Sequence, residues 1–537
     1  MKKIVLIPIL LMAVWSFGQK VDDAKRFLYY ERFESAKKQL HQLLRNDPVN
    51  AEAWYLLADA YQSSGRPVTD TLQMAPDNVK DEPFYLVALG SSYLYNNNAI
   101  DAERYFNEAL EKTKYKNAGI ILAVANAKIK NKPGDANQVI ELINRVLRKH
   151  KHNAAMYVAL GKAYRKLNNG SQAFLYFKQA IEMDKNYAEP YYLTGMIFRT
   201  QNNAELYLEY FNNAIAADIN YAPAYYQLYH HYYFRNVNTA RTYLEKFISL
   251  SDHDIQNDYN FTDILYLTGD YKAAIAHANK LIEKEKSNLP ARIYKLIAYS
   301  NHEIGNNDES FKFIHKYFSE VRDSNIIARD FILLADLYAE RKEMDSAIFF
   351  YSVGVALERD TAALVKYYRT LADLSKELKD YNARAMWLGK YYNNNPKSTN
   401  VDLFNWGLAY YQAENFEKAD SVFGIYSQRY PEQDFGYYWQ ARSNAAIDSL
   451  MEKGLAVPHY LKVVEIGEKD STANSKKHLI EAYGYLATYQ ANQIKDYDTA
   501  ITYFEKILTL DPDNDQVKKY LEVLQKTVAK KEALTDS

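Results

Sequence analysis

An acidic run and two histidine pairs are the clusters in this sequence that could bind a metal ion. The acidic run spans residues 511–515 and is followed by Glu522, a spacing that resembles a calcium-binding loop. Gln516, however, stands where such a loop needs glycine for its sharp turn. We therefore predict a turn between two helices at this place, capped by Asp513 or Asn514, and no calcium site.

The histidine pairs lack the spacing of metal ligands. His150 and His152 flank a lysine in a predicted loop, and His230 and His231 are adjacent on a predicted helix. Ligands on one face of a helix must be three or four residues apart. The chain has no cysteine, which excludes disulfides, thiolate metal sites and cysteine nucleophiles. No phosphate-binding glycine loop or nucleophile motif occurs, so we expect no catalytic residue, no metal and no cofactor.

Composition excludes nucleic acid as a partner. The net charge is −1, so no broad cationic surface is available for binding phosphates. Tyrosine is the outlier, with 50 residues against 23 phenylalanines and 5 tryptophans. Its ring packs between helices while its hydroxyl tolerates water. We expect most tyrosines to lie between helical layers and a minority to line a binding surface.

A pattern of about 34 residues recurs along nearly the whole sequence. In each clear copy, a small residue is followed by tyrosine three positions on, alanine twelve on and an aromatic residue sixteen on. The four clearest copies are Gly90, Tyr93, Ala102 and Phe106; Gly161, Tyr164, Ala173 and Phe177; Ala335, Tyr338, Ala347 and Tyr351; and Gly407, Tyr410, Ala419 and Phe423. The spacing predicts two antiparallel helices and a tight turn, with the small residue where the helices approach closely. Such repeats stack into a solenoid.

Residues 153–184 show the helical periodicity within one copy. Apolar residues return every three or four positions, which places them on one face of each helix. The sequence Asn-Asn-Gly at residues 168–170 interrupts the run and favours a turn. The tripeptide Asn-Tyr-Ala begins at Asn186 and recurs 34 residues later at Asn220. We therefore expect an asparagine cap near the start of each first helix.

At these positions the sequence resembles the tetratricopeptide repeat family. That family places a large residue, Leu, Gly or Ala, and Tyr on the first helix, then Ala and an aromatic residue on the second, often with a closing proline. The fullest matches are Trp54, Leu57, Ala58 and Tyr61; Leu403, Gly407, Tyr410, Ala419, Phe423 and Pro431; and Tyr483, Leu486, Ala487, Ala500, Phe504 and Pro512. The resemblance implies an all-α fold, a right-handed α-solenoid of about 12–13 repeats over residues 21–511. A capping helix follows, with an apolar face of Val517, Tyr520, Leu521 and Leu524.

Four stretches depart from the pattern and mark predicted joints. Residues 63–83 contain three prolines and cannot hold a normal second helix. Residues 250–260 are polar and acidic, residues 447–457 lengthen a turn, and residues 469–477 insert a polar loop. We therefore expect an N-terminal array over residues 19–249, a second array over residues 250–456, final repeats over residues 457–514, and a capping helix with its tail over residues 515–537.

The concave surface of the solenoid is the predicted binding site. In the tetratricopeptide repeat family the first helix of each repeat lines this surface. Applied to three adjacent repeats, that register implies a surface made of Lys162, Arg165, Tyr192, Met196, Arg199, Tyr226, His230 and Tyr233. Cations between aromatic rings suit an extended peptide that carries carboxylates and apolar side chains. The alternative is that these side chains are merely solvated.

The resemblance implies a non-catalytic scaffold for a protein or peptide partner, whose identity the sequence does not reveal. Family members that bind a free C-terminal carboxylate use Lys and Asn at set positions of three consecutive repeats. Lys162 stands at one such position, but Leu193 and Gln227 stand at the others, which argues against such a clamp. An alternative function is glycan binding on the same frame, because Tyr and Asn are abundant.

The N-terminus predicts export. Two lysines precede an apolar stretch over residues 4–14, and small residues follow at Ser16 and Gly18. This is the pattern of a signal peptide, residues 1–18, and we predict cleavage between Gly18 and Gln19. Elsewhere no run approaches the roughly 20 apolar residues of a membrane-spanning helix. We expect an exported protein of the bacterial periplasm or outer membrane, which can associate peripherally with envelope complexes.

Overall fold

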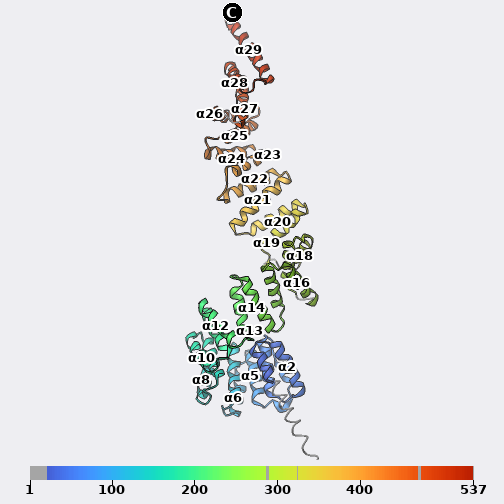
Figure 1. Cartoon of the computed structure of the whole chain (residues 1–537), viewed down its shortest axis with the longest axis vertical. Helices are drawn as coiled ribbons and strands as arrows, with labels where there is room; N and C mark the ends of the chain where they lie inside the picture. The colour runs from blue at the N-terminus through green and yellow to red at the C-terminus, as the bar shows by residue number, and fades with distance from the viewer. Residues whose placement is uncertain (1–20, 286–288, 323–324, 470–472, 536–537) are drawn as a thin grey trace, which may run out of the picture. The chain divides into compact units, whose positions relative to one another are not determined.

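The computed structural model of the chain describes residues 21–535, apart from 286–288, 323–324 and 470–472. The predicted signal peptide and its cleavage site lie outside the described residues. Within them the chain consists of helices and connecting turns without a strand, which confirms the all-α prediction (Figure 1). None of the described helices is long and apolar enough to cross a bilayer. The chain divides between Ile304 and Gly305 into two compact units.

The first unit is a run of antiparallel helix pairs. A helix over residues 21–29 pairs with α2 (Phe33–Asn46). The second pair is irregular, since α3 (Ala51–Ser63) is followed only by short α4 (Thr69–Gln73) and the 3-10 turn η1 (Asp77–Val79). The regular pairs that follow are α5 (Pro83–Tyr95) with α6 (Ala99–Lys112), α7 (Ala118–Lys130) with α8 (Ala136–Leu147), α9 (Ala154–Lys166) with α10 (Gly170–Met183), α11 (Ala188–Thr200) with α12 (Ala204–Ala217), α13 (Ala222–Tyr232) with α14 (Val237–Leu250), and α15 (Ile255–Leu267) with α16 (Tyr271–Glu285). Helix α17 (Arg292–Glu303) ends the unit.

The second unit continues the pattern from α18 (Asn307–Glu320). Its pairs are α19 (Ala328–Glu340) with α20 (Met344–Leu357), α21 (Thr361–Glu377) with α22 (Tyr381–Asn394), α23 (Asn400–Gln412) with α24 (Phe416–Arg429), α25 (Asp434–Ile447) with α26 (Val457–Gly467), and α27 (Ala473–Tyr489) with α28 (Tyr497–Leu510). A π-helical turn, η3 (Gln490–Ile494), follows α27, and α29 (Asp515–Thr535) closes the unit. The described residues thus form seven regular pairs in the first unit and five in the second, in agreement with the predicted repeat number.

Glycine on the first helix of a pair lies against an aromatic ring of the second helix. A Cβ atom at Gly161 would lie 2.3 Å from Phe177 Cε1, and the Phe177 ring is fully buried. One turn further on, Tyr164 stacks on Tyr176 with ring centroids 5.4 Å apart. The same close approach occurs at Gly90 with Phe106, Gly195 with Phe211, and Gly407 with Phe423. The predicted crossing of the two helices at a small residue is confirmed.

The predicted turn at residues 168–170 is also confirmed. Asn168 has a left-handed backbone with φ 58°, a conformation that asparagine tolerates better than most residues. Asn169 then accepts a hydrogen bond from the Gln172 amide at 3.1 Å, which caps α10. Helix α9 begins in the same way, because Asn153 accepts from the Ala155 amide at 3.1 Å.

The caps predicted at Asn186 and Asn220 are wrong. Helices α11 and α13 begin one residue later, after a tyrosine that makes no side-chain cap. The amide of Asn186 instead donates to Asp184 at 3.0 Å, and the amide of Asn220 donates to Asp218 at 2.9 Å. The aspartates close the turn before each helix, because their short side chains reach an amide two residues on.

The irregular second pair confirms the prediction for residues 63–83. Short α4 and η1 replace the second helix, yet Leu72 and Val79 are fully buried. The Tyr85 hydroxyl donates to the Leu72 carbonyl oxygen at 2.7 Å and ties this segment to α5. Residues 250–260 interrupt the helices only briefly, since Asp254 caps α15 by accepting from the Gln256 amide at 2.7 Å.

Helix α29 covers the end of the second unit. Val517 and Leu521 are buried against the last pair, as predicted. Tyr520, which we expected on the same face, is 49% exposed, although its ring stacks on Phe504. Asn514 accepts a hydrogen bond from the Val517 amide at 3.2 Å. The acidic run is therefore a capped turn between helices, as predicted.

Candidate binding cavity

Two basic side chains of α9 point into a cavity within the first unit. Lys162 and Arg165 are three residues apart on α9 and therefore lie on one face of that helix. Together with Leu193 and Ile197 of the neighbouring α11, they border a cavity of about 1130 Å³. The structure thus places both of these predicted residues in one cavity. Their role in binding stays a prediction.

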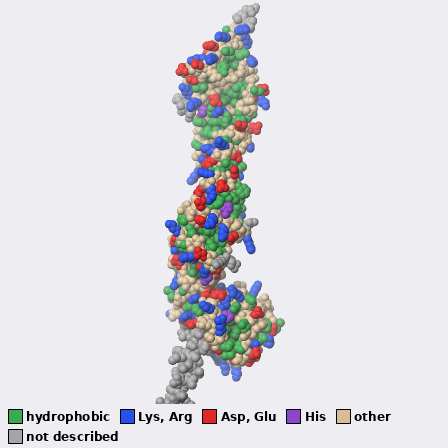
Figure 2. All heavy atoms as spheres, turned by 90° about the vertical axis from the view of Figure 1, so that its right-hand side faces the viewer, with side chains coloured by type: hydrophobic (Ala, Val, Ile, Leu, Met, Phe, Trp, Pro, Cys, Tyr) green, Lys and Arg blue, Asp and Glu red, His purple; other side chains and the backbone are tan. Residues whose placement is uncertain are grey.

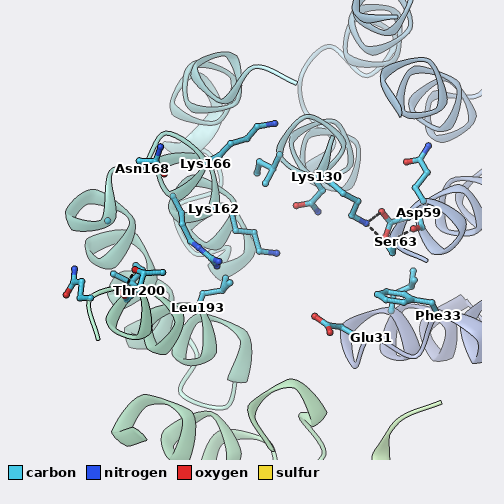
Figure 3. A pocket seen from close by; sticks show the side chains of 18 residues that line it. Glu31, Phe33, Asp59, Ser63, Lys130, Lys162, Lys166, Asn168, Leu193 and Thr200 are labelled. Carbon is cyan, nitrogen blue, oxygen red and sulfur yellow. Dashed lines mark hydrogen bonds and ion pairs between the residues drawn. The ribbon is translucent and has the colours of Figure 1, made fainter. Parts of the chain in front are cut away.

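The opposite wall of the cavity comes from the beginning of the unit. Glu31 lies in the turn before α2, and Phe33 is the first residue of that helix. Asp59 on α3 and Lys130 at the end of α7 border the same space. Figure 3 shows Glu31 and Phe33 on the side of the cavity opposite Lys162. Five helix pairs, the first, second, fourth, fifth and sixth, therefore surround the cavity.

The first helix pair closes this unit into a ring by contacting pairs much later in the sequence. The Tyr30 hydroxyl donates a hydrogen bond to Asp218 at 2.8 Å, across 188 residues of chain. The Arg32 Nε atom lies 3.3 Å from Asp252, and the Ser35 amide donates to the same carboxylate at 3.0 Å. In Figure 1 the blue N-terminal helices accordingly lie next to the green α13.

Tyr29 completes this contact. Its hydroxyl accepts a hydrogen bond at 3.1 Å from the amide of Ala188, the first residue of α11. The ring centroids of Tyr187 and Tyr221 lie 6.0 and 5.2 Å from that of Tyr29. Burial raises the pKa of Tyr29, and the neighbouring Glu189 raises it further. We name as the clasp the contact of Tyr29, Tyr30, Arg32 and Ser35 with Tyr187, Ala188, Asp218, Tyr221 and Asp252.

Basic groups outnumber acidic groups around the cavity. The charged residues that border it are Lys130, Lys162, Arg165, Lys166, Glu31 and Asp59. Lys130 pairs with Asp59, and Lys162 pairs with Glu189 at 2.5 Å. Within the described part of the chain, Arg165 forms no ion pair. Arg165 is therefore the cation that is free to receive an anion.

Lys166 has a structural role at the cavity wall. Its ammonium donates to the carbonyl oxygens of Lys128 and Asn131 at 2.7 and 2.6 Å. These carbonyls lie at the end of α7, where backbone oxygens lack helical partners. Burial lowers the pKa of Lys166, and Asp135 partly opposes this shift. The positive charge of Lys166 adds to the electrostatic potential in the cavity, but its hydrogen bonds are made to backbone carbonyls of the protein itself.

Glu31 carries a carboxylate into the cavity without an ion-pair partner among the described residues. Its backbone is left-handed, with φ 58°, at the tip of the turn between the first two helices. Loss of hydration raises the pKa of Glu31, and Glu189 raises it further. Lys162 and Lys130 lower it, although they do not cancel the rise. The cavity therefore holds an acidic group of the chain itself opposite its basic wall.

Gln62 places a buried side-chain amide in the cavity wall, and its Nε2 atom is a donor without a partner in the described structure. The residue is 6% exposed and borders the cavity. Its Oε1 atom accepts from the Ser91 hydroxyl at 2.7 Å, while Nε2 has no hydrogen-bond partner in the described structure. A buried donor without a partner costs free energy. An acceptor from a bound molecule would remove this cost.

Three of the other predicted residues lie on α11 but do not border the cavity. The ring centroids of Tyr192 and Phe211 lie 5.9 Å apart. Burial raises the pKa of Tyr192 to about 12. Met196 is partly buried against the same cluster around Phe211. Arg199 is exposed. Tyr192 and Met196 therefore contribute to packing, and their role in binding stays a prediction.

The three predicted residues of α13 and its end lie further along the unit. The Tyr226 ring lies 4.4 Å from that of His230 and 4.8 Å from that of Phe247. Burial lowers the pKa of His230, and Arg199 lowers it further. Tyr233 donates a hydrogen bond to Asp263, and burial raises the pKa of Tyr233. The eight predicted residues thus do not form one surface around a single cavity.

Sequence reasoning missed the wall that contains Glu31, Phe33, Asp59 and Lys130. The repeat register tells which face of a first helix turns inward. It does not tell how far successive pairs rotate, and this rotation decides which pairs face each other across a ring. The left-handed backbone of Glu31 places this residue at the tip of a turn, but glutamate is not typical of that conformation, so the sequence did not indicate it.

The described residues contain no group of three His, Cys, Asp or Glu side chains arranged to hold a metal ion. His231 instead hydrogen-bonds the Tyr207 hydroxyl at 2.6 Å. His150 and His152 border a separate surface depression next to Lys149. Among the described residues, Phe33 is the one aromatic residue that borders the cavity near Lys162, so the described wall offers a sugar a single ring for stacking.

Four segments of the chain match the tetratricopeptide repeat family, residues 22–68, 154–187, 403–432 and 488–514. No curated protein matches the chain. Among solved structures, the C-terminal part of a TPR repeat-containing protein from Cytophaga hutchinsonii is 28% identical over 49% of this chain and 98% of that chain, with a TM-score of 0.29. PilF from Pseudomonas aeruginosa is 16% identical over 47% of this chain and 95% of that chain, with a TM-score of 0.24. A tetratricopeptide repeat protein from Parabacteroides merdae is 13% identical over 53% of this chain and 96% of that chain, with a TM-score of 0.22.

Proposed function

We propose that this chain, which belongs to the tetratricopeptide repeat family, is a non-catalytic scaffold that holds an acidic segment of a protein partner. The proposed site is the cavity of the first unit. Solenoids of stacked helix pairs present extended concave surfaces, and such surfaces suit chain segments better than compact ligands. A partner segment would lie between the wall of α9 and α11 and the wall that carries Glu31.

The unpaired guanidinium of Arg165 is the observation that carries this proposal. It borders the cavity beside Lys162, and it forms no ion pair in the described structure. A guanidinium donates two parallel hydrogen bonds to a carboxylate, which makes arginine the strongest recognition group for acidic side chains. On the molecular face drawn in Figure 2, by contrast, basic and acidic side chains are mixed. A local excess of basic groups therefore favours an acidic segment at this cavity.

Apolar side chains beside the basic groups suit a segment of mixed composition. Leu193 is 7% exposed and Ile197 is 6% exposed, and both border the cavity next to Arg165. Apolar groups of a bound chain gain free energy when they cover such surface. The cavity volume of about 1130 Å³ exceeds that of ordinary small-molecule pockets. A peptide segment fits these dimensions better than a single metabolite.

The cell envelope is the proposed location. Support comes from the sequence alone, which begins with two lysines, an apolar stretch and small residues before Gln19. Sequencing of the mature protein tests this point. A mature chain that begins at Gln19 is expected, and a chain that keeps Met1 would contradict export.

Binding of a fluorescein-labelled hexaglutamate peptide tests the function. Fluorescence anisotropy should show saturable binding, and Arg165→Glu should weaken it by about tenfold or more because a buried anion would then face a like charge. The matched control is Lys178→Glu, which makes the same charge change at an exposed residue of α10 outside the cavity. Equal loss in both variants, or equal binding of hexalysine, would contradict the proposal.

A further inference from the structure

Two different kinds of contact hold the first helix pair in the ring. On the side of α3, Ala36, Leu40 and Leu43 are fully buried in a continuous apolar core. On the side of the clasp, Tyr29 and Tyr30 are only partly buried. Their rings pack against a small cluster around Tyr221, and the other contacts of the clasp are hydrogen bonds and one ion pair. The clasp therefore has the smaller apolar core of the two attachments.

The clasp can open without unfolding a helix pair. In a stack of helix pairs each pair is held by its neighbours in sequence, and small rotations between neighbours add up along the stack. The Tyr30–Asp218 hydrogen bond spans 188 residues, so many neighbour contacts share the movement that breaks it. Regions with few buried apolar contacts open at a lower free energy than the core of a native protein. Opening at the clasp would thus separate Tyr29 and Tyr30 from the cluster around Tyr221 and leave the larger core around Leu40 intact.

The clasp also positions Glu31. This residue lies between Tyr30 and Arg32, which bind Asp218 and Asp252 on the far side of the ring. Figure 3 shows the Glu31 side chain directed into the cavity, toward the wall that carries Lys162. When the turn is docked, the carboxylate of Glu31 occupies space between the two walls. When the turn is released, this carboxylate moves away from the basic wall.

We propose that the clasp is a gate, and that Glu31 is an internal competitor for the acidic segment of the partner. This inference rests on the proposed function of the cavity. A segment gains access when the clasp opens and Glu31 withdraws. The clasp then closes behind the segment and slows its release. The closed ring therefore holds a bound segment longer than an open groove would.

A pair of cysteines across the clasp tests the gate directly. The chain has no cysteine, so Ser35→Cys with Asp252→Cys introduces the only two thiols. The Ser35 amide donates to Asp252 at 3.0 Å, so the two positions are adjacent. Oxidation, or a short bismaleimide, should join them and lock the clasp. The reduced form of the same protein is the matched control, because it carries both substitutions without the lock.

Hexaglutamate binding is then measured by stopped-flow anisotropy in both forms. We expect the lock to slow association by about tenfold or more, and to slow the release of peptide that was bound before oxidation. Equal rates in the two forms would overturn the gate and leave the proposed function standing. If no form binds the peptide, the proposed function fails and the gate fails with it. If neither reagent joins the cysteines, the clasp does not form in solution and the gate is wrong.

Glu31→Gln tests the competitor separately, without disturbing the clasp. Removal of one negative charge inside the cavity should tighten hexaglutamate binding by about fivefold or more. Glu182→Gln, at an exposed residue of α10 outside the cavity, is the control for the change in net charge. A Glu31→Gln affinity equal to that of the control would overturn the role of Glu31.

Discussion

The Tyr30 hydroxyl donates a hydrogen bond to Asp218 at 2.8 Å, although 188 residues separate the two in the chain. This contact brings the first helix pair of the unit against the sixth and seventh pairs. It turns the stack of helix pairs into a ring with an interior. The basic side chains of α9 thereby face a second protein wall rather than open solvent.

Tyr30→Phe removes the donor of this hydrogen bond while keeping the ring. We expect the free energy of unfolding of the first unit to fall by about 1 kcal/mol, because the carboxylate of Asp218 remains accessible to water. Amide hydrogen exchange should rise at Ala188 and over residues 218–221. Tyr95→Phe on α5, outside the clasp, is the control. A loss of stability without faster exchange at Ala188 would contradict a local opening of the clasp.

Gly161→Ala tests the close approach of the helices in a pair. The added Cβ would lie 2.3 Å from the Phe177 ring, which is fully buried and has no space to yield. Overpacking of this kind costs about 1–3 kcal/mol, which exceeds the gain of alanine over glycine in a helix. Gly170→Ala is the matched control, since its nearest atom is Ile197 Cγ2 at 3.5 Å. Denaturant unfolding should show a loss for Gly161→Ala and none for Gly170→Ala. The reverse order would refute the packing argument.

Glu31→Gln should raise stability at neutral pH. The folded protein raises the pKa of Glu31 above its ordinary value of 4.5, so the folded state binds this proton more tightly than the unfolded state. The contribution of Glu31 to stability is therefore fully present below about pH 4.5 and is lost as pH rises through the raised pKa. The variant should match the wild type in acid and exceed it near pH 7. A difference that grows as pH falls would have the wrong sign. Chemical denaturation over this pH range measures it.

Glu481→Gln probes the polar network of the second unit. The Glu481 carboxylate accepts hydrogen bonds from Tyr438 at 2.5 Å and Tyr460 at 3.0 Å, and it lies 3.3 Å from the Arg442 guanidinium. Loss of the charge should cost about 1–2 kcal/mol, since three donors share this acceptor. Glu465→Gln, which breaks an exposed pair with Lys462, should cost much less, because water screens an exposed ion pair. Similar losses in both variants would show that the network adds nothing beyond a surface ion pair.

Local features of the fold could be predicted from the sequence, and contacts across the ring could not. Gly161, Phe177 and the turn at residues 168–170 follow from spacing within one repeat, and the structure bears them out. The caps at Asn186 and Asn220 were wrong because aspartate two residues earlier binds the turn instead. Spacing alone does not distinguish these two residues, since both side chains reach nearby amides.

The cavity depends on the rotation between successive helix pairs, which the sequence pattern of a single repeat does not determine. Lys162 and Arg165 follow from the register of α9, and the structure places them in the cavity. Glu31 and Phe33 reach the same cavity only because the rotations between successive pairs sum to a closed ring. That sum depends on packing at every interface between neighbours, including the irregular pair at α4.

Photo-cross-linking from Phe33 tests the account most directly. Phe33 borders the cavity, whereas Phe234 is 89% exposed outside it, so benzoylphenylalanine at these two positions forms a matched pair. We expect the probe at Phe33 to join a partner through a segment rich in Asp and Glu, as mapped by mass spectrometry, and the probe at Phe234 to leave that segment free. A partner that joins equally at Phe234, or that copurifies without joining at Phe33, would contradict binding within the ring.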